Sequence, residues 1–167
     1  TFNPTIPLPS SLTTLYLSGN QIVTFNPTIP LPSGLSILGL NYNQIVTFNP
    51  TIALPSSLTA LYLGHNKIVT FNPTIALPSS LSILSLSYNK IVTFNPTIAL
   101  PSSLTLLGLA GSKMTLAGYT ASEVWANAQP AFTNPCYVYF GGNIDSITGT
   151  NLEAILLTKN CIIRPQL

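Results

Sequence analysis

Few residues in this chain could carry acid–base, nucleophilic or metal chemistry. The 167 residues include one histidine, His65, and two cysteines, Cys136 and Cys161. The acidic residues all follow residue 120: Glu123, Asp145 and Glu153. A histidine-centred triad needs an acidic partner, and neither a G-x-S-x-G elbow, a phosphate loop nor an H-E-x-x-H motif is present. The sequence therefore predicts no catalytic residue, no metal site and no cofactor.

The elements that position these residues come from a repeat of 23 residues. Phenylalanine recurs at that period, each time in a TFNPTI block: Phe2, Phe25, Phe48, Phe71 and Phe94. Within each unit the apolar residues follow the pattern L-x-x-L-x-L-x-x-N-x-I, as in Leu12, Leu15, Leu17, Asn20 and Ile22. A fixed period of this length is typical of a solenoid, whose units bury their apolar faces by stacking.

The spacing also predicts which way the side chains point. In L-x-L, Leu15 and Leu17 should face inward while Tyr16 faces out, so each unit adds one short strand to a parallel sheet. An asparagine follows each strand and should satisfy backbone groups in the turn. This expected asparagine ladder comprises Asn20, Asn43, Asn66 and Asn89. Phe25, Ile29 and Leu31 should fill the core from the opposite, proline-rich side, which we expect to be extended.

This pattern resembles the leucine-rich repeat family. The resemblance implies an α/β solenoid with one parallel β-sheet and an extended, proline-rich convex side. We expect the solenoid to span residues 1–116, with a C-terminal capping segment at residues 117–167. The chain enters in mid-repeat, which leaves Phe2, Ile6 and Leu8 without a preceding strand. This suggests either a truncated N-terminal end or a covering subunit.

After Lys113 the repeat pattern ends and a helix–strand–helix–strand cap is expected. Capping boxes predict helices from Thr120 to about Ala128 and from Thr150 to about Lys159. The intervening strands should be residues 136–140 and 161–164, giving seven strands in one sheet. This segment is similar to the closing segments of leucine-rich repeat proteins of bacteriophages and uncultured viruses, which implies a virion-associated role.

The two cysteines should open neighbouring strands. If these strands are in register, Cys136 and Cys161 come within disulfide range. The sequence therefore predicts a disulfide, which would indicate an oxidising environment, while two buried thiols are the alternative.

The outward strand positions form the predicted concave face. Tyrosines alternate there with small residues in two columns, and the candidate ligand-binding residues are Tyr16, Asn41, Tyr42, Tyr62, His65 and Tyr88. Aromatic rings beside hydroxyl and amide groups could stack on sugars, so a glycan or protein surface is the expected partner. The alternative is that tyrosine simply packs well across strands, with His65 an exposed substitution at a tolerant position.

Charge is scarce, at 5% of residues, and the net charge is +2. This composition favours a protein embedded in a particle or extracellular layer, and gives no case for nucleic-acid binding or membrane insertion. The cationic pattern is a column of Lys67, Lys90 and Lys113, which continues Gln21 and Gln44 of the earlier units. It could attract a polyanion or form a solvated ridge.

Together these features predict a non-enzymatic module for adhesion or recognition, extracellular or virion-associated. A structural subunit that forms a filament or particle by end-to-end stacking, as a homo-oligomer, is the first alternative. The LPSSL and LPSGL segments are also similar to units of secreted bacterial effectors. The ubiquitin-ligase motif of some effectors, Cys-x-Asp, is not found at Cys136 or Cys161, so the second alternative is an effector fragment without that activity.

Overall fold

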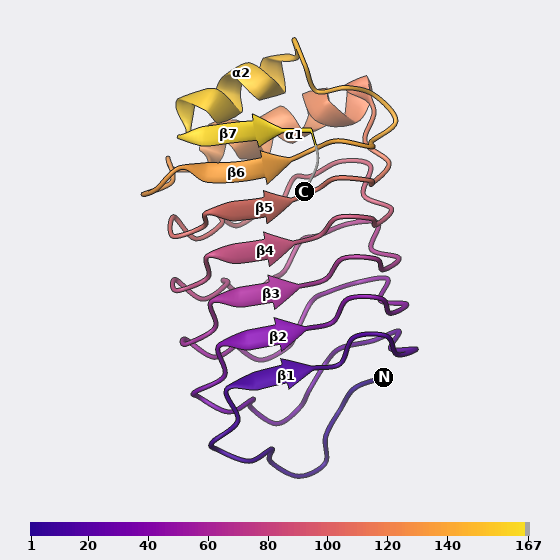
Figure 1. The fold of residues 1–167 in the computed structure, drawn as a ribbon, viewed down its shortest axis with the longest axis vertical. Helices are drawn as coiled ribbons and strands as arrows, with labels where there is room; N and C mark the ends of the chain where they lie inside the picture. The colour runs from indigo at the N-terminus through magenta and orange to yellow at the C-terminus, as the bar shows by residue number, and fades with distance from the viewer. Residues whose placement is uncertain (166–167) are drawn as a thin grey trace.

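The computed structural model describes residues 1–165, and its frame is one parallel sheet of seven strands in chain order (Figure 1). The strands are β1 (Thr14–Tyr16), β2 (Ile37–Gly39), β3 (Ala60–Tyr62), β4 (Ile83–Ser85), β5 (Leu106–Gly108), β6 (Cys136–Tyr139) and β7 (Cys161–Arg164). Equivalent residues of successive units pair, as Leu38 does with Leu61. The predicted solenoid with one parallel sheet is confirmed.

The inner leucines of the strands form one side of the core. Leu38, Leu61 and Leu84 are fully buried, as are the leucines two residues further on. Leu15, in β1 at the edge of the stack, is only half-buried. The predicted inward orientation of the L-x-L pattern is therefore confirmed, and each strand depends on its neighbours for burial.

The proline-rich side supplies a stack of phenylalanine rings. Phe2, Phe25, Phe48, Phe71 and Phe94 stack with neighbouring ring centroids 5.6–6.3 Å apart. Leu31 is buried beside this stack, whereas Ile29 is only half-buried. The repeat units contain no helix on this side, since the first helix of the described residues begins at Leu116.

A second ladder, which the sequence did not lead us to expect, runs along the proline-rich side. The Oδ1 atom of Asn49 accepts hydrogen bonds from both the backbone N–H and the hydroxyl of Thr74 in the next unit, at 2.9 and 3.0 Å. Asn3, Asn26 and Asn72 make the same pair of contacts. The N-P-T triplet therefore connects successive units where an extended chain lacks strand pairing.

Asn43, Asn66 and Asn89 form a buried ladder in the sheet turns. The amide nitrogen of Asn66 donates to the carbonyls of Leu40 and Leu63, at 2.9 and 3.0 Å, and its Oδ1 accepts from the Ile45 N–H. Asn43 and Asn89 are buried in the same arrangement. Asn20, in the first unit, is exposed and bonds only within its own turn.

The ladder is interrupted at Ser112 and resumes at Asn143. The Ser112 hydroxyl is buried without a hydrogen-bond partner, because it is too short to reach the carbonyls that asparagine bonds. Asn143 then donates to Leu109 and Phe140 and accepts from the Met114 N–H. The spacing Val138-x-Phe140-x-x-Asn143 repeats L-x-L-x-x-N, so Asn143 occupies the ladder position of its unit, which we did not identify from the sequence.

Two helices, α1 (Leu116–Ala128) and α2 (Asn151–Thr158), lie at the end of the stack that carries β6 and β7 (Figure 1). The predicted start of α1 at Thr120 is wrong, because Thr115 accepts from the Gly118 N–H and caps the helix earlier. The Thr120 hydroxyl donates to the Leu116 carbonyl within the helix instead. The capping residue of α2 is Thr150, as predicted.

Helix α1 takes the place of a further proline-rich segment. Trp125 meets the last phenylalanine ring, Phe94, edge-on, with the ring centroids 4.8 Å apart. The Ser122 hydroxyl accepts from the Phe94 N–H, and the buried Gln129 amide bonds both the N–H and the carbonyl of Leu100. These bonds satisfy backbone groups of the last repeat that α1 covers.

At the β1 edge of the stack apolar side chains are incompletely covered. Ile6 is 73% exposed, and Phe2, Leu8 and Leu12 are only partly buried. A stacking subunit at this edge stays a prediction.

Candidate binding surface

The outward positions of the strands form the surface that we call the sheet face. Its first row is largely apolar and half-buried, and consists of Thr14, Ile37, Ala60, Ile83, Leu106 and Tyr137. Its second row is Tyr16, Gly39, Tyr62, Ser85, Gly108 and Tyr139. The sheet face carries no charged side chain on β1 to β6, whereas Arg164 on β7 lies over the Tyr137 ring, 5.5 Å from its centroid.

Tyrosine and small residues are complementary in the second row. Tyr16 is 67% exposed, and its ring lies over the next unit, where a Cβ added at Gly39 would come within 2.6 Å of the ring. Tyr62 is half-buried in the same row, next to Ser85. The glycine thus leaves space for the ring. This agrees with the alternative interpretation of the tyrosines, in which they pack across neighbouring strands and do not bind a ligand.

The turns after the strands hold a second aromatic group, which we call the aromatic stack. Tyr42, His65 and Tyr88 are exposed and stacked, with ring centroids 4.2 and 4.4 Å apart. Their backbones have φ values of 55°, 51° and 57°, in the left-handed region that side chains rarely adopt. The equivalent positions, Gly19, Gly111 and Gly142, have the same sign of φ and are glycine.

The aromatic stack leaves few ring faces free. Tyr42 lies on His65, His65 lies on Tyr88, and a Cβ added at Gly111 would come within 2.4 Å of the Tyr88 ring. The outer face of Tyr42 points toward the first unit, where the equivalent residue is Gly19 and supplies no ring, and the outer face of Tyr88 lies over Gly111. The stack therefore presents ring edges, phenol groups and the imidazole to solvent, which limits the sugar stacking that the sequence suggested.

Asn41 is a structural residue in this arrangement. Its Oδ1 accepts from the Gly64 N–H at 2.7 Å, so the amide links two neighbouring turns. Among the predicted ligand-binding residues, Asn41 thus already has a partner within the chain.

The lysine column runs beside the aromatic stack. Lys67 and Lys90 come two residues after His65 and Tyr88, with a buried asparagine between, and are exposed, as is Lys113. Their backbone N–H groups donate to Ile45, Ile68 and Ile91 of the preceding units, each at 2.9 Å, which holds the column in register. The Lys67 ammonium donates to Gln44 at 3.1 Å.

The predicted disulfide is wrong, although the register that suggested it is correct. Cys136 pairs with Cys161 in adjacent strands, but both are free, buried thiols. A hydrogen bond between the thiols raises the pKa of Cys136, and burial raises it further, while the same bond lowers the pKa of Cys161. The cysteine pair therefore gives no indication of an oxidising environment.

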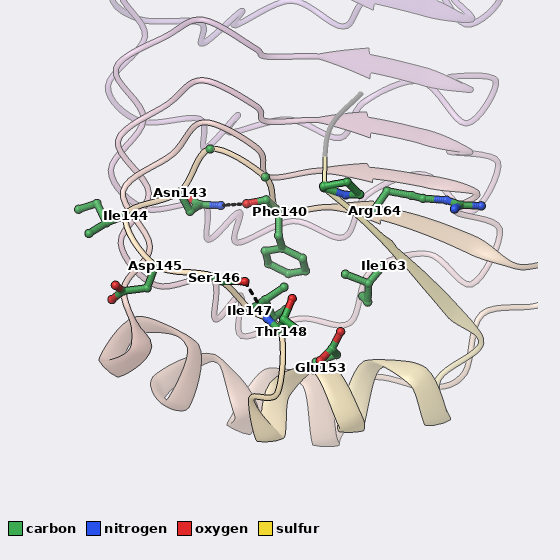
Figure 2. A pocket seen from close by; sticks show the side chains of 13 residues that line it. Phe140, Asn143, Ile144, Asp145, Ser146, Ile147, Thr148, Glu153, Ile163 and Arg164 are labelled. Atoms are coloured by element: carbon green, nitrogen blue, oxygen red, sulfur yellow. Dashed lines mark hydrogen bonds between the residues drawn. The ribbon is translucent and has the colours of Figure 1, made fainter.

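The cap contains a surface cavity of about 450 Å³, in which the Phe140 ring faces Ile163 and Glu153 (Figure 2). Glu153 accepts from the Gly149 N–H at 2.7 Å and Ser146 accepts from the Thr148 N–H, so these polar groups hold the loop before α2. Asp145 points away from the cavity and accepts from the Leu116 N–H (Figure 2). Burial, with the charge of Asp145, raises the pKa of the nearby Tyr119 to about 12.

Acidic groups and His65 lie in different parts of the molecule. His65 is in the third turn of the sheet, while Glu123 is on α1, Asp145 precedes α2 and Glu153 is in the first turn of α2. Within residues 1–165, no cluster of His, Cys, Asp or Glu side chains is placed to hold a metal ion. Neither α1 nor α2 has the length and apolarity that a bilayer crossing requires.

The leucine rich repeat family model matches residues 10–68. The matched segment covers the first strands of a parallel, open sheet whose unit continues at the same period to residue 114. The repeat region has the leucine-rich repeat fold. A search of the curated proteins gives no match. The family model ends before the cap, so the similarity of this segment to viral proteins stays a prediction.

Proposed function

We propose that this protein is a non-enzymatic binding module that recognises another protein through its sheet face. Leucine-rich repeat domains generally mediate protein binding. The observation that carries the proposal is the partly apolar sheet face, uncharged on β1 to β6, with its exposed Tyr16 and half-buried Tyr62. Tyrosine is enriched at protein interfaces because its ring buries a large apolar area while the hydroxyl forms hydrogen bonds.

The rigidity of this surface supports binding without large rearrangement. Backbone hydrogen bonds connect every strand to the next, and bonds such as Leu40 N–H to Tyr62 carbonyl, at 2.8 Å, continue the pairing beyond the strand ends. A surface whose side chains are already held in place loses little conformational entropy when a partner binds. A protein partner is favoured over a neutral glycan, because most ring faces of the aromatic stack are occupied by other rings.

The test compares a Tyr16→Ser/Tyr62→Ser variant with the unchanged protein. Serine is compatible with the fold at these positions, since Ser85 occupies the same row. Fluorescent tetramers of each would be applied to an array of cell-surface protein domains and to an array of neutral glycans. We expect binding to particular protein domains that falls at least tenfold in the variant.

The matched control is Val46→Ala/Val69→Ala, which removes exposed apolar groups outside the sheet face. This variant should bind like the unchanged protein. Signals confined to neutral glycans, or protein binding that the tyrosine variant retains in full, would contradict the proposal.

We further propose that the module acts outside the cell or on a virion. Support comes from the 5% content of charged residues, which suits a component of a particle or surface layer. Immunogold labelling of the producing culture with an antibody against the cap tests this proposal. Label on particles or the outer cell surface is expected, and label restricted to the cell interior would exclude it.

A further inference from the structure

The lysine column and the aromatic stack together form a strip of hydrogen-bond donors that is separate from the sheet face. It contains Lys67, Lys90 and Lys113 in one row and Tyr42, His65 and Tyr88 in the other. The two rows are two residues apart in the same turns, so their Cα atoms are at most about 7 Å apart. All six side chains are exposed.

We propose that this strip binds a linear anionic polysaccharide, one that carries carboxylate or sulfate groups along its chain. The proposal goes beyond the protein recognition proposed above and uses a different surface. Three features of the strip carry it: its charge, its spacing and the way in which the rings are presented.

The first feature is charge. Ammonium groups donate hydrogen bonds only, and the phenol and imidazole groups beside them can donate as well. Residues 1–112 contain no acidic residue that could neutralise Lys67 and Lys90. Asp145 approaches the column only at its end, where its backbone N–H donates to the Met114 carbonyl and its carboxylate already accepts from Leu116. The strip therefore complements a ligand rich in anionic acceptors.

The second feature is spacing. The backbone bonds of the lysine column hold one cation on each of three successive units, about 4.8 Å apart. Successive rings of an extended polysaccharide advance by a similar distance, so an acidic sugar polymer can present an anion to each unit. An acidic peptide strand presents same-side carboxylates only about every 6.8 Å and would lose register along the column.

The third feature is ring presentation. Because the faces of Tyr42, His65 and Tyr88 are largely covered by each other, the strip offers polar ring edges along its length. The phenol hydroxyls of Tyr42 and Tyr88, with the imidazole of His65 between them, can bond sugar hydroxyls and acid groups from the side. The face of Tyr42 toward Gly19 has no ring stacked on it and can receive one sugar ring where the strip begins.

The experiment measures binding of the whole chain to immobilised heparin and polygalacturonate, at 20 and 300 mM sodium chloride. The principal variant is Lys67→Gln/Lys90→Gln/Lys113→Gln, in which glutamine occupies positions that Gln21 and Gln44 already fill in the earlier units. We expect it to bind at least tenfold more weakly than the unchanged protein at low salt. Binding by the unchanged protein should also weaken at least tenfold between the two salt concentrations.

A second variant, Tyr42→Gly/Tyr88→Gly, tests the aromatic row. Glycine stands at the equivalent Gly19 and Gly111 with the same left-handed backbone, so the turns should persist. We expect a three- to tenfold loss of binding. The matched control is Lys159→Gln/Arg164→Gln, which removes two charges from the cap, outside the strip, and should leave binding within twofold.

Four results would overturn the proposal. They are unchanged binding of the triple lysine variant, equal binding to neutral dextran, equal loss in the cap control, and binding to poly-glutamate or single-stranded DNA as tight as to the polysaccharides. A circular dichroism melt of each variant shows whether the fold is retained. If the triple variant does not fold, the single Lys90→Gln variant replaces it, with an expected twofold to fivefold loss.

Discussion

The repeat units and the cap cover the same sheet in different ways. In residues 1–114 each unit packs against a unit of nearly the same sequence. Asparagines therefore make the same hydrogen bonds in successive turns, and phenylalanine rings stack on one another. In the cap, unlike groups meet: Trp125 lies edge-on to Phe94, and the Gln129 side chain pairs with the backbone of Leu100. A column of identical residues can continue indefinitely, so ending it requires residues that accept its last contacts and offer no further copy.

The two regions also differ in what they leave at the surface. The repeat units have no room for side-chain variation in their ladders, and their variable positions are the outward ones, such as Tyr42, His65 and Gly111. The cap carries every acidic residue of the chain. The outward positions of the repeats are therefore where binding surfaces can differ between units, whereas the acidic side chains of the cap accept hydrogen bonds from N–H groups within it.

The largest expected effect comes from breaking the phenylalanine stack in the middle of the repeats. Phe71→Ala should lower the free energy of unfolding by about 3–5 kcal/mol, because it leaves a cavity between Phe48 and Phe94. Phe2→Ala, at the half-buried end of the stack, is the control and should cost much less. Urea unfolding followed by circular dichroism measures both, and equal losses would argue against a shared stack.

The asparagine ladder gives the next largest effect. Asn66→Ala should cost about 3 kcal/mol, since the Leu40 and Leu63 carbonyls and the Ile45 N–H lose a buried partner. Asn20→Ala, at an exposed position, should cost under about 1 kcal/mol because water replaces the lost bonds. The same urea unfolding experiment measures both variants. Similar losses of unfolding free energy at the two positions would show that burial does not determine how much a ladder asparagine stabilises the fold.

At the junction between the two regions we expect a stabilising substitution. Ser112→Asn should raise the free energy of unfolding by about 1 kcal/mol, because it restores a ladder residue between Asn89 and Asn143. Ser112→Ala is the control, since it removes the unpaired hydroxyl without adding ladder bonds. If the two variants melt at the same temperature, the missing ladder bonds are not what limits stability there.

The last effect, which is absent at neutral pH, concerns the cap alone. The folded protein holds the Tyr119 proton up to about pH 12, because burial and Asp145 disfavour the phenolate, whereas an unfolded tyrosine has a pKa of about 10. Between these values the unfolded state releases the proton first, so stability should fall as pH rises from about 10 to 12. Urea midpoints from pH 8 to 11.5 should therefore fall less in Tyr119→Phe, and parallel profiles would contradict this prediction.

Much of the fold could be predicted because the same local sequence pattern recurs in each repeat unit. The L-x-L spacing gave the strands and their inward leucines, and the recurring asparagine gave the ladder at Asn43, Asn66 and Asn89. The start of α1 was missed because Thr115 and Thr120 are both able to cap, and only packing against the last repeat favours the earlier one. Asn143 was missed because its unit lacks the TFNPTI block.

The candidate surfaces were predictable in composition but not in geometry. The sequence indicated tyrosine columns and a lysine column, whereas the direction in which each ring leans depends on the space above the next unit, such as that over Gly39. The thiols of Cys136 and Cys161 came into register as predicted, yet register between strands does not decide whether a bond forms.

The sequence by itself determined a 23-residue solenoid, the residues facing its core and the scarcity of charge, because periodic burial is encoded in each unit separately. Only the tertiary structure decided that the rings of Tyr42, His65 and Tyr88 cover one another, that the N-P-T triplets form a second ladder, and that α1 ends the phenylalanine stack. These contacts join residues more than twenty positions apart, so their geometry depends on how neighbouring units pack.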